Sequence, residues 1–213
     1  MKKTISILND PGFEKKDQIL DVAEALFSKH GFDGVSIRSL AKQANINIAM
    51  VSYYFGSKEN LYIAVIERKM VTIRQYLTEA FPNGGNAWDK LYYIIDRYVD
   101  RMVDNRSFMN IVFTEVASEN REHIVDFLSK RLADNQEAFG GLIVEGIKSA
   151  HFREVDPQLA IMSIIGPLKL YVSNPFMVKK MMNENTIEGC YSSVHRDRMK
   201  AHLKDLMTRF LKP

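Results

Sequence analysis

The stretch SYYFGSKE, residues 52–59, brings together side chains that could bind phosphate groups. Tyr53 and Tyr54 offer hydroxyl groups, and Lys58 follows a glycine and a serine that favour the start of a helix. A lysine in the first turn of a helix faces the positive end of the helix dipole, which is unfavourable unless an anion is bound there. Contacts of this kind position a protein on the backbone of a nucleic acid. Phe55, between them, is expected in the core.

Catalytic and metal-binding patterns are weaker. Cys190 and His195 could form a nucleophile and base, but no signature of a cysteine enzyme surrounds them. Glu119 and His123 lie four apart on one helix face, yet a single pair does not make a metal site. There is no glycine-rich loop of the kind that cradles phosphates. We therefore expect no enzyme activity, no catalytic residues, no metal and no cofactor.

The elements that must position these residues are helices. Apolar residues recur at helical spacing through most of the chain, and the alternation typical of strands is absent. The pattern predicts an all-α fold. Pro167 predicts a kink or local break in the helix that contains it. The expected helices are at about 15–29, 37–44, 48–55, 58–70, 87–104, 107–118, 121–150, 157–181 and 191–211.

The first three helices describe a helix-turn-helix unit. Gly31 is placed as a helix stop, and Ser36 can cap the second helix. The turn before the third helix needs a residue that tolerates a left-handed backbone, and Asn45 is the best candidate. Asn47 can cap the third helix, and Ala49 keeps that helix slim enough to enter the major groove of DNA.

At these residues the chain resembles the DNA-binding module of the tetracycline-repressor (TetR) family, from Ile19 to about Lys69. Two positions depart from the family pattern: Asn45 stands where glycine is usual, and Ser52 stands where tyrosine is common. The matching positions are Ala23, Leu26, Phe27, Gly31, Phe32, Ser36, Ile37, Leu40, Ala41, Ala44, Tyr53, Tyr54, Phe55, Lys58 and Leu61.

The resemblance implies a C-terminal helical domain that binds a small molecule and dimerises. It divides the chain into a flexible arm (1–14), a helix-turn-helix DNA-binding domain (15–60) and an effector-binding and dimerisation domain (61–213). The expected partner is a near-palindromic double-stranded operator, since one small reading head contacts one half-site. The residues expected at the DNA are Ser36, Arg38, Asn47, Ile48, Ala49, Ser52, Tyr53, Tyr54 and Lys58.

Aromatic and methionine side chains are frequent in the middle helices, which suits an adaptable apolar cavity. An ordinary core is the competing interpretation for each of them. The candidate ligand-binding residues are Tyr92, Ile95, Met102, Phe108, Met109, Phe113 and Phe127. The carboxylates Asp96, Asp100 and Glu115 could meet a cationic ligand, but they could equally be solvated or pair with Arg97 and Arg101.

Two apolar stripes on the last two long helices predict a dimer interface built from two helices of each subunit. Internal packing of the stripes is the alternative. The candidate interface residues are Met162, Gly166, Leu170, Met199, Leu203, Leu206 and Phe210.

Composition agrees with a cytoplasmic protein without membrane spans. Hydrophobic residues make up 46% of 213, the net charge is +3, and the single cysteine cannot form an internal disulfide. We expect a homodimeric transcriptional regulator, a repressor released from its operator by a small apolar or aromatic effector. Two alternatives remain open: a helical small-molecule-binding protein without operator control, and a helical enzyme that uses the C-terminal domain.

Overall fold

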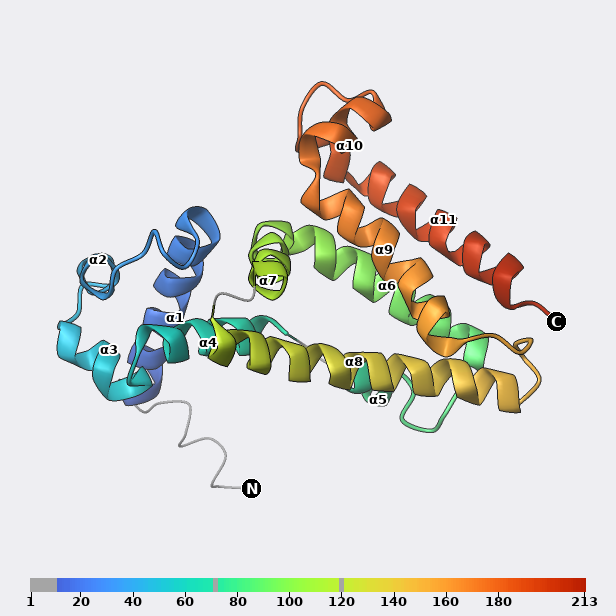
Figure 1. The fold of residues 1–213 in the computed structure, drawn as a ribbon, viewed down its shortest axis with the longest axis horizontal. Helices are drawn as coiled ribbons and strands as arrows, with labels where there is room; N and C mark the ends of the chain where they lie inside the picture. The colour runs from blue at the N-terminus through green and yellow to red at the C-terminus, as the bar shows by residue number, and fades with distance from the viewer. Residues whose placement is uncertain (1–10, 71–72, 119–120) are drawn as a thin grey trace. The chain divides into compact units, whose positions relative to one another are not determined.

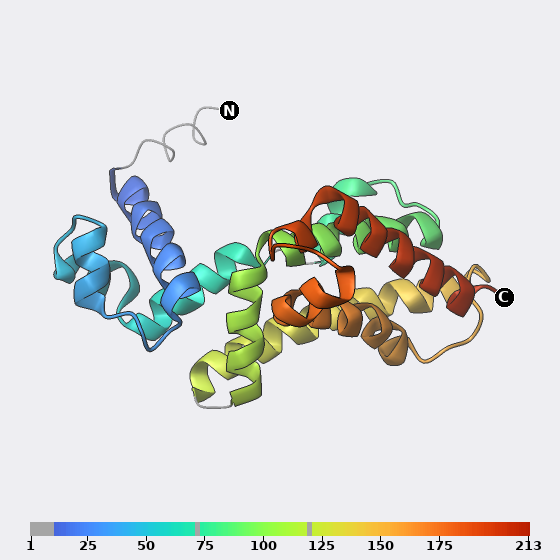
Figure 2. The same ribbon diagram turned by 90° about the horizontal axis from the view of Figure 1, so that it is seen from above.

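The computed structural model describes residues 11–70, 73–118 and 121–213 (Figures 1 and 2). The all-α prediction is confirmed, because the described residues form helices and no strand. Contacts divide the chain into two compact units. The first runs to Met70 and includes Ala117–Phe127, and the second comprises Val71–Val116 and Leu128–Pro213.

The first unit is built on α1 (Pro11–His30), α2 (Ile37–Gln43), α3 (Ile48–Phe55) and α4 (Lys58–Lys69). Helices α2 and α4 pack on α1, and α3 packs on α2 and α4. An aromatic cluster lies at the centre. The ring of Tyr62 meets Phe27 edge-on at 4.9 Å and Phe32 at 5.1 Å between centroids. Because α4 buries Tyr62 and its apolar neighbours here, this unit continues past residue 60, the boundary expected from the sequence.

The start of α1 also differs from expectation. Residues 1–10 of the expected arm lie outside the described residues, whereas 11–14 belong to α1. Proline suits the first turn of a helix because its fixed φ is helical and its missing N–H would have no partner there. Pro11 can therefore begin the helix four residues before the expected Lys15.

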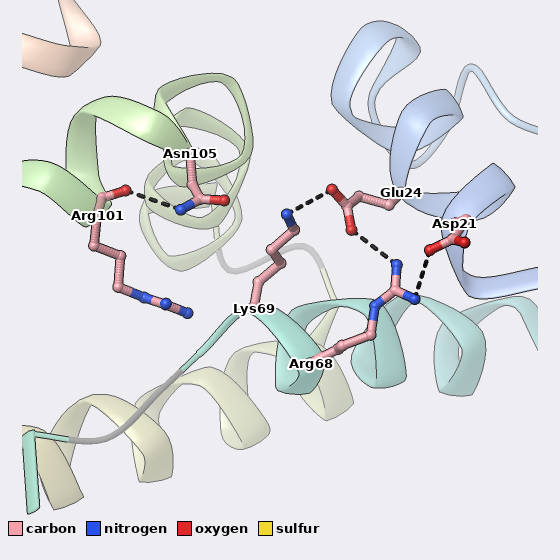
Figure 3. A network of polar contacts seen from close by, with 6 residues as sticks. All are labelled: Asp21, Glu24, Arg68, Lys69, Arg101 and Asn105. Atoms are coloured by element: carbon pink, nitrogen blue, oxygen red, sulfur yellow. Dashed lines mark hydrogen bonds and ion pairs between the residues drawn. The ribbon is translucent and has the colours of Figure 1, made fainter. Parts of the chain in front are cut away.

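Ion pairs tie α4 to α1. Figure 3 shows the guanidinium of Arg68 between Asp21 at 2.8 Å and Glu24 at 2.9 Å. Lys69 binds the other oxygen of Glu24 at 2.7 Å. The amide of Gln18 donates to the carbonyl of Ala44 at 3.0 Å, which links α1 to the end of α2.

The predicted caps and turns are confirmed. Ser36 caps α2 in a capping box, and the side chain of Asn47 accepts a hydrogen bond from Ala49 N at the start of α3. Ser57 accepts from Asn60 N at the start of α4. The turn between α2 and α3 places Asn45 at φ +52°, in the left-handed region.

The second unit is organised around α6 (Ala87–Asp104), which packs against α5 (Ile73–Ala80), α9 (Pro157–Ser173) and α11 (Ser193–Leu211). Polar pairs join α6 to α11 in antiparallel register. They are Tyr92 with Thr208 at 2.7 Å, Asp96 with Lys204 at 2.6 Å, Asp100 with Lys200 at 2.7 Å and Asp104 with Arg196 at 2.6 Å. Each step moves one helical turn along both helices, so these pairs fix the register.

Three other helices complete the unit: α7 (Arg106–Ser118), α8 (Glu122–Lys148) and α10 (Pro175–Met182), with a short 3-10 turn at Gly189–Tyr191. The ends of α7 and α8 nearest residues 119–120 belong to the first unit.

The long helix expected over 157–181 is broken, but not at Pro167. Helix α9 continues through Pro167 and ends at Ser173. Asn174 adopts φ −125° and ψ 60°, because a residue that precedes a proline is disfavoured from helical angles, and α10 begins at Pro175. Helices α9 and α10 are bent by 97° at this point.

None of the described helices is by itself long and apolar enough to cross a membrane. Among the described helices, the bent pair α9 and α10 reaches the required length and composition when taken together.

The left-handed turn generates a test of the first unit. Asn45→Ala should lower the free energy of unfolding by about 1 kcal/mol, because a residue with a Cβ and no local hydrogen-bonding side chain pays for this φ. Asn45→Gly should be as stable as the wild type. Gln43→Ala, an exposed neighbour in ordinary helix, serves as the control and should change stability by less than about 0.5 kcal/mol. Urea unfolding followed by circular dichroism measures all three, and equal stability of the alanine and glycine variants at residue 45 would contradict the assignment.

Candidate DNA-binding site

Positive charge is concentrated locally on the first unit. From Gly34 to Lys58 the chain carries Arg38, Lys42 and Lys58 and no aspartate or glutamate. Asp21 and Glu24 of α1 are paired with the cations of α4. The modest net charge of +3 therefore does not describe the surface of α2 and α3, which is free of acidic side chains.

Helix α3 has one buried and one exposed side. Val51 and Phe55 are buried, which confirms Phe55 as a core residue. Tyr53 is 83% exposed, and Ile48 is 42% exposed despite its apolar side chain. Ala49 and Ser52 are also exposed. The exposed side of α3 is thus narrow, with small residues between Ile48 and Tyr53, and this shape suits a major groove.

Tyr54 differs from Tyr53. Its side chain is half-buried, and its ring meets the ring of Tyr53 edge-on at 5.1 Å and that of Phe55 at 6.4 Å. Tyr54 therefore supports the exposed ring of Tyr53 as well as carrying its own hydroxyl.

Asn47 has a structural role that leaves part of its side chain available. Its Oδ1 accepts the backbone N–H of Ala49 at 2.9 Å. The amide Nδ2 can still donate to an acceptor outside the protein. Ser36 plays a similar part on α2, where its Oγ accepts from Ser39 N at 3.0 Å, and Arg38 is exposed two residues further on.

Lys58 is the first residue of α4, and its Nζ lies 4.1 Å from the centre of the Phe32 ring. The guanidinium of Arg121 lies 4.5 Å from the same ring and pairs with Asp33. This pairing of two cations over one ring has no signal in the sequence, because Arg121 is distant along the chain and only folding brings it to Phe32. Contact with the ring holds Lys58 while leaving its N–H donors available.

The backbone at Lys58 adds to this site. At the start of α4 the backbone N–H of Asn60 donates to the Ser57 side chain. The backbone N–H groups of Lys58 and Glu59 come too early in the helix to have a carbonyl acceptor within it. An anion at this helix end would meet free N–H groups and the positive end of the dipole.

Comparison with known proteins decides the family. The profile of "Bacterial regulatory proteins, tetR family" matches residues 19–65, which cover most of α1 and all of α2 and α3. The profile "Tetracyclin repressor-like, C-terminal domain" matches residues 84–170. The chain belongs to the TetR family.

Two relatives from bacteria illustrate the range of similarity. "Probable HTH-type transcriptional regulator YttP" of Bacillus subtilis is 26% identical over 171 residues, which are 79% of this chain and 80% of the relative. "HTH-type transcriptional repressor NicS" of Pseudomonas putida is 33% identical over 100 residues, 47% of each chain. These TetR-family relatives are regulators and not enzymes.

Among solved structures, the transcriptional regulator FadR from Bacillus subtilis in complex with stearoyl-CoA has the same fold. It aligns with a TM-score of 0.67 at 20% identity, over 89% of this chain and 96% of FadR. The fold of a TetR-family regulator therefore extends through both units.

The residues expected to line a ligand site in this TetR-family chain lie mostly in or against the core of the second unit. Ile95, Met102 and Phe108 are buried in the core of the second unit, and Met109 and Phe113 pack against it. The Tyr92 hydroxyl is engaged with Thr208, and Phe127 belongs to the first unit. Asp96 and Asp100 pair with lysines of α11 rather than with neighbouring arginines. Spacing along a helix does not distinguish a core face from a pocket face, so a ligand-binding role for these side chains stays a prediction.

The two stripes expected at the dimer interface differ in exposure: the stripe on α9 is exposed, and the stripe on α11 is largely buried. On α9, Met162 and Leu170 are 62% and 47% exposed, and Gly166 is exposed between them. On α11, Leu203 is fully buried in the core, and Met199 and Phe210 pack against that core. Leu206, at 36% exposed, borders the surface. Leu203 is therefore corrected to a core residue, because α11 turns that face towards α6.

The enzyme alternative loses its candidate nucleophile. Cys190 is fully buried and donates to the carbonyl of Thr186, and desolvation by burial raises the pKa of its thiol. A protonated, inaccessible thiol is a poor nucleophile. His195 Nε2 is engaged with Glu184 at 2.6 Å. Glu119 lies outside the described residues, and within them no group of three or more metal-binding side chains occurs.

Proposed function

We propose that the protein is a homodimeric, ligand-responsive repressor that binds a near-palindromic operator and leaves it when a small effector binds. The observation that carries the proposal is the acid-free surface of α2 and α3, with an exposed slim helix and Lys58 at the start of α4. The relative NicS is named a transcriptional repressor, which supports repression rather than activation for this protein. Operator binding places the protein with the chromosome, in the cytoplasm.

The protein would make two kinds of contact with the operator, one with base edges and one with phosphates. The exposed residues of α3, with Asn47 and Ser52, lie near base edges and supply sequence preference. Lys58, Tyr53, Tyr54, Ser36 and Arg38 contact phosphates and supply affinity that does not depend on sequence.

Dimerisation would come from the exposed apolar stripe of α9. Leu159 is 59% exposed, and it continues the line of Met162, Gly166 and Leu170. Such a row of apolar side chains on a helix surface is stabilised when a second copy covers it. A two-fold pairing through this face would present two reading heads to two half-sites.

Release would follow from differential binding. The dimer would have one form that spans both half-sites and another that does not. An effector that binds the second form more tightly shifts the population towards it, and the protein leaves the operator. The complex of FadR with stearoyl-CoA supports a partly apolar effector class.

The proposal is tested with a duplex that covers the upstream region of the protein's own gene and a scrambled duplex of equal length. Wild type should bind the first much more tightly. Lys58→Ala should weaken both by similar factors and reduce the salt slope by roughly one unit per subunit, because one phosphate contact is lost from each. Tyr53→Phe should lower affinity without loss of folding, since only an exposed hydroxyl is removed.

The matched control is Lys29→Ala, an exposed lysine at the end of α1. It removes the same charge outside the α2–α3 surface and should leave the salt slope close to that of the wild type. An unchanged slope for Lys58→Ala would contradict the phosphate contact. Equal affinity of wild type for both duplexes would favour a small-molecule-binding protein without operator control.

Two substitutions of Asn47 distinguish its role as a helix cap from its proposed contact with DNA. Asn47→Asp keeps the cap acceptor and should retain stability, but the new negative charge should weaken operator binding strongly. Asn47→Ala should cost about 1 kcal/mol of stability through loss of the cap. The melting temperature and operator affinity of both variants are measured together. An aspartate variant that binds DNA as well as the wild type would place Asn47 away from the groove.

The dimer is tested with Leu159→Glu combined with Leu170→Glu. Both side chains are exposed, so the variant should fold, sediment as a monomer and lose operator affinity. Leu203→Glu should instead unfold or aggregate, because it would bury a charge in the core. A Leu159/Leu170 variant that remains dimeric by sedimentation would show that α9 does not form the interface.

A further inference from the structure

A cavity of about 580 Å³ lies between α8 and α9 in the second unit. Figure 1 shows the two helices that bound it. This volume falls within the range of sites that hold small organic molecules. None of the residues that the sequence analysis favoured for ligand binding lines it.

Two glycines keep the cavity open. Gly140 of α8 and Gly166 of α9 both line it, and both lie within helices at ordinary φ. A Cβ on Gly166 would have no heavy atom within 4 Å, and one on Gly140 would first meet Ile161 Cδ1 at 3.9 Å. An alanine would therefore fit at either position, and glycine inside a helix costs roughly 0.5–1 kcal/mol relative to alanine. The space is retained although the backbone does not require glycine at either position.

The wall is apolar on one side and carries one charge. Ile161, Met162 and Ile165 of α9 supply the apolar side. Glu137 of α8 is the one formally charged residue among those that line the cavity. Its carboxylate is exposed and has no ion-pair or hydrogen-bond partner among the described residues. The side-chain amides of Gln136 and Gln158 also border the space and can orient a polar group.

We propose that this cavity binds an amphipathic organic cation, whose apolar body lies on Ile161, Met162 and Ile165 and whose nitrogen lies beside Glu137. The unpaired carboxylate selects positive charge, and the apolar wall selects a hydrocarbon or aromatic body. The inference rests on the proposed function, since it names the chemical class of the effector. An anionic amphiphile would place like charge beside Glu137.

The position of the cavity also explains how such a cation could act on the dimer. Met162 and Gly166 belong both to the cavity wall and to the exposed stripe of α9. A ligand that displaces the Met162 side chain changes the surface offered to the second copy. Binding and the spacing of the reading heads are thereby linked through one helix face.

The probes are decyltrimethylammonium and decyl sulfate, used below their micelle concentrations with the intact protein and without DNA. Isothermal titration should show saturable binding of the ammonium compound and at least tenfold weaker binding of the sulfate. Glu137→Gln should weaken ammonium binding about twofold to fivefold, as expected for loss of one exposed ion pair. The control Asp134→Asn removes the same charge from an exposed residue of α8 outside the cavity and should bind as the wild type does.

Gly166→Leu should fill the cavity and abolish binding, with circular dichroism and the melting temperature as the check on folding. Glu137→Gln changes an exposed side chain, so it tests the proposal even if the leucine variant does not fold. Equal binding of both probes, or unchanged affinity of Glu137→Gln, would overturn the proposal. So would a Gly166→Leu variant that folds and still binds, or a wild-type dimer that binds neither probe because a second copy fills the cavity.

A separate titration of operator complexes distinguishes this inference from the proposed function. Cation binding that depends on Glu137 but leaves operator affinity unchanged would support the cavity site and contradict effector control. Specific operator binding without any cation binding would contradict the cavity site and leave the proposed operator binding intact.

Discussion

The first unit depends on the burial of one face of α4 against α1. Leu61, Tyr62, Val65 and Ile66 are all fully buried, and Tyr62 closes the aromatic cluster with Phe27 and Phe32. Removing four such side chains from water contributes several kcal/mol, at about 1.5–3 kcal/mol each before entropy is subtracted. Because α4 is held in this way, its first turn, with Ser57 and Lys58, has a fixed position beside α3.

Phe32 extends this constraint to charged groups. Lys58 and Arg121 both lie over its ring, and Arg121 pairs with Asp33. One buried ring thus holds a side chain proposed to contact phosphate and a side chain from the segment at the start of α8. A change at Phe32 would disturb both, so the ring connects the core of the unit to its proposed DNA surface.

Local features of the fold could be predicted from the sequence, and features that arise from packing could not. Asn45 at the turn and Ser36, Asn47 and Ser57 at helix starts were predictable, because caps and turns depend on a few neighbouring residues. The sequence predicts a kink at Pro167, whereas the helix breaks before Pro175. Both prolines lie in one apolar stretch, and the pattern does not show that α9 continues through Pro167.

The second unit shows why site residues are harder to predict. By residue type and spacing, Tyr92 is a candidate for a ligand pocket and Leu203 is a candidate for a dimer interface. The antiparallel register of α6 and α11 gives Tyr92 a partner in Thr208 and buries Leu203, and neither contact follows from spacing along one helix. The α8–α9 cavity, in turn, is marked by the glycines Gly140 and Gly166, whose lack of a side chain has no distinctive sequence signal.

The central claim is that paired copies of the α2–α3 surface read a specific two-fold DNA sequence. Selection of bound duplexes from a random-sequence library by the wild-type protein tests it most directly. The account predicts enrichment of an inverted repeat whose half-site centres lie about 10 base pairs apart or a multiple of that, since each head enters one major groove on the same side of the duplex. Selection that yields no common sequence, or one unpaired half-site, would contradict it.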